Sequence, residues 1–301
     1  MNRQIVPIQI SVGIPAYNEE QNIVSVLNAL LQQKEEAWEL VEIVVYDDGS
    51  TDNTLKKIAS VRDPRIRVVA DGMRQGKTTR LRQMFSEFKG DILCVIDADL
   101  RLEGANLITK LIEPFSDSRV MLVGGNVLPE KPVTFIQRSV YATFQVFYES
   151  RKTIRGGNNI FGCGGIIAIR HRLADKIDLP EIFNEDAYIY LSCIKNKFKF
   201  KYQDAARGYY KLPLTLSDYL RQAFRSHPEA VSIELKKYFG DLIDVELSRP
   251  FLFYIRTVLH TFALYPLEVA YITLIHLAIK PLYGIISSRY KLSWFTAAST
   301  H

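Results

Sequence analysis

The stretch Ile92-Leu93-Cys94-Val95-Ile96-Asp97-Ala98-Asp99 decides the fold class, because it joins a wholly apolar run to two aspartates. An apolar run of this length is typical of a parallel strand that is covered on both faces. Side chains in a strand repeat every second residue, so Asp97 and Asp99 can both point into the crevice where open α/β sheets bind ligands. Two carboxylates there can hold one Mg²⁺ or Mn²⁺ whose shell substrate phosphates complete. The alternative is a solvated strand end before a turn.

The chain around this stretch alternates predicted strands with predicted helices. Apolar runs predict strands over residues 8–14, 40–46, 66–70 and 92–96, and helical spacing predicts helices over 19–37, 52–60 and 78–88. Strands that alternate with helices imply crossover connections and a mostly parallel sheet. No repeat or low-complexity linker interrupts the first 230 residues, and the chain becomes strongly apolar after Arg249-Pro250.

Length and composition indicate a folded protein with a substantial core. The chain has 301 residues, 48% of them hydrophobic, and a formal net charge of +5. Basic and acidic residues are mixed, so we expect no nucleic-acid partner. The three cysteines, Cys94, Cys163 and Cys193, are widely spaced and form no metal-ligand pattern, which predicts reduced core thiols. The first residues lack the apolar stretch of a signal peptide, so we expect the catalytic part in the cytoplasm.

Polar clusters follow two further predicted strands. The first is Pro15-Ala16-Tyr17-Asn18-Glu19-Glu20, in which Pro15 stiffens the strand exit, Asn18 can cap the next helix and Tyr17 can stack on a base. The second, Asp47-Asp48-Gly49-Ser50-Thr51-Asp52, is a tight turn whose acids can accept hydrogen bonds from a nucleobase or ribose. A turn with a helix cap and no ligand is the alternative interpretation.

A third cluster, residues 72–79, is similar to the phosphate-binding loop of P-loop NTPases. That loop needs four residues between its glycines, and here Asp71 stands where the first glycine belongs. The spacing therefore argues against a nucleoside triphosphatase. Lys77 or Arg74 can still reach a diphosphate as a point charge.

Taken in order, these motifs resemble those of family 2 glycosyltransferases with the GT-A fold. The resemblance runs over residues 8–230 and is carried by the segments 12–20, 44–52, Gly76-Lys77, Asp97-Ala98-Asp99, 162–165 and Asn184-Glu185-Asp186. It implies an α/β, Rossmann-like, mostly parallel sheet flanked by helices, with a nucleotide-binding half over 1–100 and an acceptor half over 101–230. It also implies a nucleotide-sugar donor, a divalent cation and inversion at the anomeric carbon.

The resemblance assigns a role to each matching position. The residues that it implies for donor binding are Pro15, Tyr17, Glu19, Asp47, Asp48, Lys77 and Asp97, and Asp99 with Asp97 would hold the Mn²⁺ or Mg²⁺. Glu185 and Asp186 look like the acidic catalytic pair, with Asp186 the general base that takes the proton of an acceptor hydroxyl. A helix N-terminus rich in acids is the alternative for this pair. Gly164 and Gly165 resemble the acceptor-side segment, where small residues permit close approach, although a structural bend explains them as well.

One segment departs from the family pattern. Processive polysaccharide synthases and ceramide-type glucosyltransferases carry Gln-X-X-Arg-Trp where this chain has Gln222-Ala223-Phe224-Arg225-Ser226. Gln222 and Arg225 are kept and are expected to bind the donor pyrophosphate, but the aromatic platform is missing. Processive synthesis is therefore doubtful, and an amphipathic helix with solvated arginines is the alternative.

The C-terminal part, residues 231–301, is predicted to be helical and membrane-associated. Residues 257–275 approach the length of a spanning helix but include Glu268 and Pro266. One imperfect span, a re-entrant hairpin and two helices lying at the membrane surface are all compatible with this pattern. A buried helical pair or a dimer contact is the alternative.

The sequence therefore predicts a glycosyltransferase at the cytoplasmic face of a membrane. We expect an inverting, metal-assisted enzyme that moves a sugar from a nucleotide-sugar, UDP-linked in preference to GDP-linked, to a lipid-linked or saccharide acceptor. The competing functions are a processive polysaccharide synthase subunit, a P-loop NTPase and a non-catalytic protein that binds sugar nucleotides.

Overall fold

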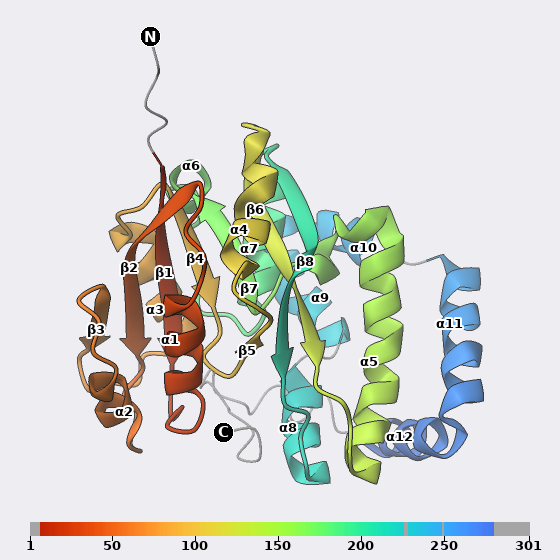
Figure 1. Ribbon diagram of the computed structural model, residues 1–301. Helices are drawn as coiled ribbons and strands as arrows, with labels where there is room; N and C mark the ends of the chain where they lie inside the picture. Colours follow the sequence, from red (N-terminus) through yellow and green to blue (C-terminus); the bar gives the residue numbers. More distant parts are fainter. Residues whose placement is uncertain (1–6, 226–227, 249, 280–301) are drawn as a thin grey trace.

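A computed structural model describes residues 7–225, 228–248 and 250–279 of the chain. A single eight-stranded sheet runs through it in the order β3-β2-β1-β4-β7-β6-β8-β5 (Figure 1). The strands are β1 (Ile8–Ala16), β2 (Trp38–Asp47), β3 (Ile66–Ala70), β4 (Ile92–Ile96), β5 (Arg101–Leu102), β6 (Val120–Pro129), β7 (Ile166–Arg170) and β8 (Lys199–Tyr210).

The two halves of the sheet differ in strand direction. β1 pairs in parallel with β2 and β4, and β2 with β3, as the alternation of strands and helices predicts. Antiparallel pairs appear beyond β4, between β4 and β7, β6 and β7, and β5 and β8, while β6 and β8 are parallel. The mostly parallel sheet is therefore confirmed for the N-terminal half, and the whole sheet is mixed.

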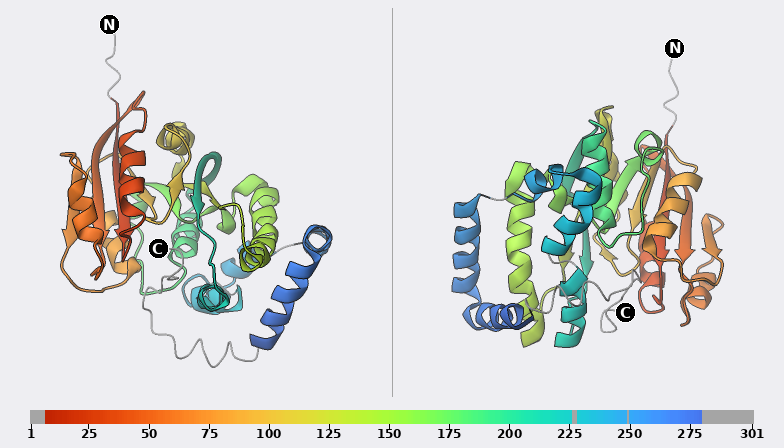
Figure 2. Two further views of the ribbon diagram at one scale, coloured as in Figure 1. Left: turned by 60° about the horizontal axis from the view of Figure 1, so that its bottom comes forward. Right: turned by 180° about the vertical axis from the view of Figure 1, so that it is seen from behind.

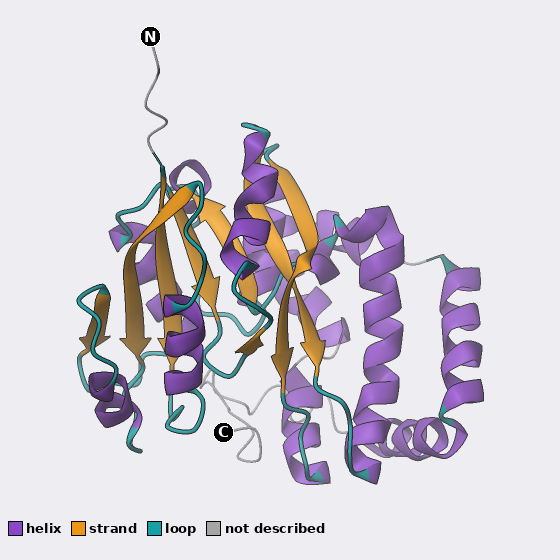
Figure 3. Cartoon of the chain, in the orientation of Figure 1, coloured by secondary structure: helices purple, strands orange, loops and turns teal. Residues whose placement is uncertain are grey.

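Helices cover both faces of the sheet (Figures 2 and 3). They are α1 (Ile23–Leu31), α2 (Thr54–Ser60), α3 (Lys77–Glu87), α4 (Leu107–Ile112), α5 (Phe135–Thr153), α6 (His171–Ala174), α7 (Glu185–Lys195), α8 (Leu216–Arg225), α9 (Pro228–Phe239), α10 (Leu242–Leu247), α11 (Phe251–Leu264) and α12 (Pro266–Ile279), with short 3₁₀ helices at Glu113–Ser116, Ile154–Gly157 and Ile160–Gly162. The predicted helix over 19–37 is shorter in the structure, because the side-chain amide of Gln33 donates to Gly104 O at 3.0 Å and holds the chain beyond α1 against a distant loop.

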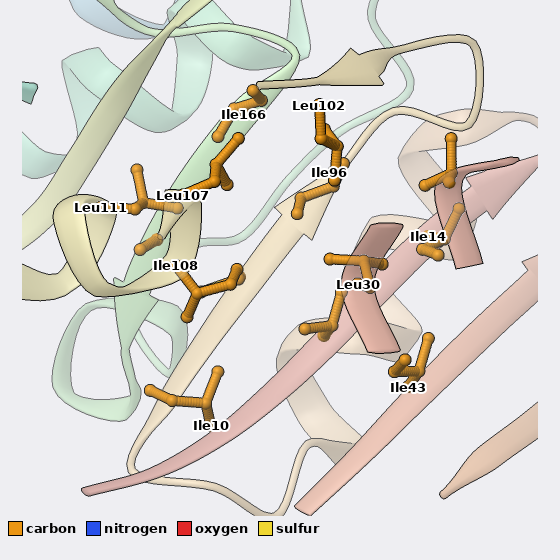
Figure 4. Packing of buried hydrophobic residues seen from close by; sticks show 14 of the residues in the cluster. Ile10, Ile14, Leu30, Ile43, Ile96, Leu102, Leu107, Ile108, Leu111 and Ile166 are labelled. Atoms are coloured by element: carbon orange, nitrogen blue, oxygen red, sulfur yellow. The ribbon is translucent and has the colours of Figure 1, made fainter. Parts of the chain in front are cut away.

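The alternation of side chains along β4 creates two hydrophobic cores. Ile92, Cys94 and Ile96 face the core formed with α1 and α4 (Figure 4), whereas Leu93 and Val95 face the core formed with α3, α6 and α7. Both sides of β4 are buried, which explains why its sequence is apolar throughout. The second core also takes in Leu235 of α9 and Ile243 of α10, so it extends past residue 230.

The C-terminal helices α11 and α12 lie beside α5. The Arg138 guanidinium on α5 donates to Glu268 on α12 at 2.9 Å, and Tyr219 on α8 shares a hydrogen bond with His276 on α12. Pro266 begins α12 and divides the 257–275 stretch, because proline has no N–H to continue α11. The single imperfect span considered for this stretch is therefore wrong. Among the described residues, we find no helix with the length and apolar character needed to cross a membrane.

Candidate active site

The predicted site residues come from the carboxyl ends of neighbouring strands. β1, β2 and β4 are adjacent and parallel, so the loops that follow them leave the same edge of the sheet (Figure 1). Pro15 is buried inside β1 opposite Tyr46, and Asp47 is the last residue of β2. The N-termini of helices α3 and α7 bring Lys77, Glu185 and Asp186 to the same region.

Lys77 is the centre of a charged cluster at this edge. Its ammonium nitrogen lies 2.8 Å from Asp97 Oδ1 and 2.9 Å from Glu185 Oε1, and its side chain is mostly buried. Burial alone lowers the pKa of Lys77, but the charges of Asp97, Glu185 and Asp186 outweigh it and raise the pKa well above its ordinary value. Lys77 is therefore a permanent cation that connects the donor-side aspartate with the predicted catalytic pair. Sequence reasoning assigned Lys77 to the diphosphate and missed these partners.

Asp97 and Asp99 occupy the position expected from the sequence, directly after β4. The Asp97 N–H donates to Gly165 O at 2.9 Å, and both aspartate side chains are half-buried. Burial is the main cause that raises the pKa of Tyr210. The Arg151 charge lowers this pKa and the Asp99 charge raises it, so Asp99 lies close enough to Tyr210 for the two groups to interact electrostatically. Arg151 is a buried cation that sequence reasoning missed, and it donates to Val127 O at 2.8 Å.

The metal that the resemblance implies can be compared with these donors. Carboxylate oxygens suit Mg²⁺ and Mn²⁺, which bind hard ligands. Within the described residues, no group of three His, Cys, Asp or Glu side chains can hold a metal ion without further ligands. Asp97 and Asp99 therefore fit a cation only if substrate oxygens and water supply the remaining ligands, as the sequence pattern predicts.

Asp48 has a different environment from the one expected. Its carboxylate is fully buried and accepts hydrogen bonds from Gln75 N at 2.8 Å, Gly76 N at 3.0 Å and Arg80 Nε at 3.1 Å. In this structure Asp48 therefore holds the loop before α3, and its contact with a nucleobase stays a prediction. These hydrogen bonds use the backbone N–H groups of Gln75 and Gly76, in the loop that is similar to the phosphate-binding loop of P-loop NTPases. This is a second difference from a P-loop.

Asp47 is also fully buried, at the end of β2. Its Oδ2 accepts hydrogen bonds from Gly49 N at 3.1 Å and Ser50 N at 3.0 Å, which closes the turn that follows the strand. Its Oδ1 has no hydrogen-bond partner, which is unusual for a buried carboxylate oxygen. Asp47 therefore organises the turn in this structure. Its contact with the donor stays a prediction.

Arg80 links several loops beneath the site, and sequence reasoning missed it. Its guanidinium is completely buried and donates to both oxygens of Asp71, at 2.8 and 3.0 Å, and to Met73 O at 2.7 Å, in addition to Asp48. The hydrogen bonds from Arg80 hold the pKa of Asp71 far below its ordinary value. A signal was present in the sequence, because an acid occupies position 71 where the P-loop pattern has glycine.

The β1 loop packs against the loops around it. The Arg74 guanidinium lies 3.8 Å above the centre of the Tyr17 ring and donates to its hydroxyl at 3.0 Å. Asn18 does not cap α1, because its Oδ1 accepts from Thr51 N at 2.8 Å instead. Glu19 is buried, and its backbone N–H donates to Thr54 Oγ1 at 2.7 Å. Three loops that follow separate strands are thus joined in one surface at the predicted base-binding side.

Glu185 and Asp186 form the first turn of α7, next to the glycines of the predicted acceptor segment. A Cβ atom added to Gly164 would lie 3.1 Å from Asp186 Oδ2, and one added to Gly165 would lie 3.1 Å from Val127 Cγ2 and 3.6 Å from Asp97 Oδ2. Gly165 has a φ of +66°, a left-handed conformation that favours glycine. Gly164 therefore lies close to the Asp186 carboxylate, and Gly165 lies close to Val127 and the Asp97 carboxylate.

The last predicted donor contacts are on α8. Gln222 is half-buried on this helix. Arg225 ends α8, but its side chain lies outside the described residues, as does Ser226. The pyrophosphate roles predicted for Gln222 and Arg225 stay predictions.

A family model and several known proteins are similar to this chain. A model of the glycosyl transferase family 2 matches residues 11–178. The undecaprenyl-phosphate 4-deoxy-4-formamido-L-arabinose transferase of Proteus mirabilis is 28% identical over 96 residues, which are 31% of this chain and only 29% of that protein. The UDP-Glc:alpha-D-GlcNAc-diphosphoundecaprenol beta-1,3-glucosyltransferase WfgD of Escherichia coli is 25% identical over 187 residues, 62% of this chain and 70% of that protein.

A solved structure shows the same fold. The mannosyltransferase PcManGT from Pyrobaculum calidifontis, in complex with GDP-Man and Mn²⁺, superposes with a TM-score of 0.59 over 94% of this chain and 84% of that one. The sequences are 17% identical, so this likeness concerns the fold alone.

Proposed function

This chain belongs to glycosyl transferase family 2, and from that premise we propose that it is an inverting glycosyltransferase. It transfers a sugar from a nucleotide-sugar, UDP-linked in preference to GDP-linked, to a lipid-linked or saccharide acceptor. The observation that carries the proposal is the cluster in which Lys77 contacts Asp97 and Glu185 while the Asp186 carboxylate lies close to Gly164. Donor-side and acceptor-side groups of the family pattern are adjacent there.

Each residue of the cluster has a chemical task in this proposal. Asp186 accepts the proton of the acceptor hydroxyl as its oxygen attacks the anomeric carbon. Lys77 places a fixed positive charge beside the position where negative charge develops on the departing diphosphate. Asp97 and Asp99 would hold the divalent cation, which supplies further charge stabilisation to the leaving group when it is bound. Tyr17, with Arg74 over its ring, offers an aromatic surface to the base.

We propose that the α11–α12 pair attaches the enzyme to the cytoplasmic face of a membrane. On α11 the buried positions include Thr257 and Thr261, whose hydroxyls donate back to the helix backbone, while Phe251 and Leu252 are 74% and 80% exposed. This distribution is the reverse of that expected for a helix in water. Exposed leucines continue along α12 at 267, 274 and 277. Such a pair suits a helix that lies in the membrane surface.

A binding screen followed by a transfer assay tests the enzymatic proposal. UDP- and GDP-sugars are added with and without Mn²⁺, because a ligand that binds the native state raises the apparent melting temperature. We expect stabilisation by a nucleotide-sugar that is larger with Mn²⁺, and release of nucleoside diphosphate when an acceptor is present. Binding without any release of nucleoside diphosphate would instead favour the non-catalytic alternative. Turnover of ATP or GTP with no sugar would contradict the proposal.

A further inference from the structure

We propose that Glu234 on α9 is a positioning residue for the acidic pair Glu185-Asp186, an inference that rests on the proposed function. The Glu234 carboxylate accepts a hydrogen bond from Phe183 N at 3.1 Å and another from Asn184 Nδ2 at 3.0 Å. These two residues come immediately before Glu185 in the chain. Glu234 lies beyond the segment that the family model matches, so no matched motif assigns it a role.

Asn184 uses its side chain for Glu234 and not for the helix that it precedes. It is the N-cap of α7, a position where an asparagine oxygen commonly accepts from backbone N–H groups of the first turn. Within the described structure its side chain makes no such capping bond. Because a carboxylate only accepts hydrogen bonds, the Asn184 amide turns its nitrogen toward Glu234. Glu234 therefore fixes the orientation of the residue from which α7 starts.

The helix that carries Glu234 is firmly attached to the core. Leu235, the next residue, is completely buried among the side chains of α3, α6 and α7. The Tyr188 ring on α7 packs edge-on against Tyr238 and Phe239 of α9, with ring centres 5.4 and 4.9 Å apart. A polar contact holds a functional group in place only when its own support is rigid. The packing of α9 meets this condition.

Two separate sets of contacts hold the first turn of α7. One is the ion pair in which Glu185 Oε1 lies 2.9 Å from the Lys77 ammonium, which also contacts Asp97. The other is the pair of hydrogen bonds to Glu234. Lys77 binds a side chain of the acidic pair, whereas Glu234 binds the backbone at Phe183, just before the helix. The place of the whole turn therefore depends on Glu234.

This role affects the rate of transfer more than donor binding. A general base acts only within hydrogen-bond reach of the proton that it takes, and a displacement of about 1 Å can cost about 100-fold in rate. Glu234 binds the loop before α7, whereas the residues proposed for the nucleotide follow β1 and β2. Loss of the Glu234 carboxylate should therefore slow transfer and leave donor affinity nearly unchanged.

Glu234→Ala in the full chain provides the first measurement. UDP-glucose and GDP-mannose with Mn²⁺ are the donors, octyl β-D-glucoside and citronellyl phosphate are the acceptors, and release of nucleoside diphosphate gives the rate. We expect this rate to fall by about 10- to 100-fold, while the donor dissociation constant from calorimetry stays within about twofold. Circular dichroism fixes an assay temperature at which both proteins are folded. Asp241→Ala, at a side chain that is 95% exposed beside α10, is the control and should transfer normally.

Two further variants separate positioning from a general loss of stability. In Glu234→Gln the glutamine oxygen can accept from Phe183 N, and its amide nitrogen can donate to Asn184 once the Asn184 amide turns over. We therefore expect Glu234→Gln to recover most of the lost rate. Asn184→Ala removes one of the same two hydrogen bonds and should also slow transfer. Adding it to Glu234→Ala should cause no further loss, because both changes break the same bond.

A rate for folded Glu234→Ala within about twofold of the wild type would overturn the inference, and so would a loss of donor affinity as large as the loss of rate. A Gln variant as slow as the Ala variant would overturn it as well. If Glu234→Ala did not fold, Asn184→Ala and Glu234→Gln would carry the same comparison. If the wild type neither bound a nucleotide-sugar nor released nucleoside diphosphate, the proposed function itself would fail, which is a distinguishable result.

Discussion

The Lys77 ammonium lies 2.9 Å from the carboxylate of Glu185, a residue that is distant in sequence and begins the helix α7. The same nitrogen contacts Asp97 at 2.8 Å, so one cation joins the end of β4 to the start of α7. Replacing Lys77 by methionine leaves three acids near one another without their shared counter-ion. The consequences reach both stability and binding.

For Lys77→Met we expect the free energy of unfolding to fall by about 3–5 kcal/mol, the usual cost of breaking a buried ion pair. The donor dissociation constant should rise at least tenfold, because the remaining carboxylates repel a diphosphate. Urea unfolding and calorimetric titration with UDP-glucose measure the two effects. Lys89→Met, at a side chain that is 68% exposed, is the control. Donor binding equal to that of the wild type would contradict this role.

Arg80→Leu should destabilise the protein by about 3–5 kcal/mol, since it leaves the buried Asp48 carboxylate without its charged partner. Arg80→Lys should recover only part of the loss, because a lysine cannot reproduce the forked contacts to Asp48 and Asp71. Urea midpoints give the comparison. A Lys variant as stable as the wild type would mean that charge alone matters at this position.

Asp71 should contribute an acid-sensitive part of the stability. Arg80 lowers the pKa of Asp71 in the folded state, so this contribution is complete above the unfolded pKa of about 3.9 and is lost as the pH falls below it. We therefore expect the urea midpoint of the wild type to fall more steeply below about pH 4 than that of Asp71→Asn. Parallel pH curves for the two proteins would exclude a stabilising Arg80–Asp71 pair.

The sequence predicted the elements whose pattern depends on local burial. The strand over 92–96 is buried throughout and ends where its apolar run meets Asp97. The strand over 66–70 also has the predicted bounds, although Arg67, Val68 and Ala70 are exposed. The site was harder to predict, because the partners of Lys77 depend on how α3 packs against α7. Asp48 illustrates the same difficulty. From the sequence, an acid in a turn is expected to be available to a ligand. In the structure, however, the Asp48 carboxylate is buried and accepts hydrogen bonds from Arg80 and the loop before α3.

Gly164→Ala should reduce transfer by more than tenfold and leave the donor dissociation constant within about twofold. The added methyl group would lie 3.1 Å from Oδ2 of Asp186, the carboxylate proposed to accept the proton of the acceptor hydroxyl. Steady-state transfer and calorimetric donor binding separate the two quantities. Gly104→Ala is the control, because Gly104 also has a positive φ, +72°, but nothing lies within 4 Å of its added Cβ. Unchanged transfer by Gly164→Ala would contradict the proposed role of Asp186.

Membrane attachment through α11 should depend on side chains that contribute little to folding. Leu252 and Leu259 are 80% and 63% exposed, so replacing both by glutamine should leave the melting temperature nearly unchanged. In a lipid surface, however, each leucine contributes up to about 1.5–3 kcal/mol when it is fully buried, so the double variant should bind phosphatidylglycerol-containing vesicles at least tenfold more weakly. Co-sedimentation measures the bound fraction. Val245→Gln on α10, at a side chain with 64% exposure, controls for a general loss of surface hydrophobicity. If the double variant sedimented with vesicles as the wild type does, the exposed leucines would not bind the bilayer. If it also changed from a dimer to a monomer, these leucines would instead form a contact between protein chains.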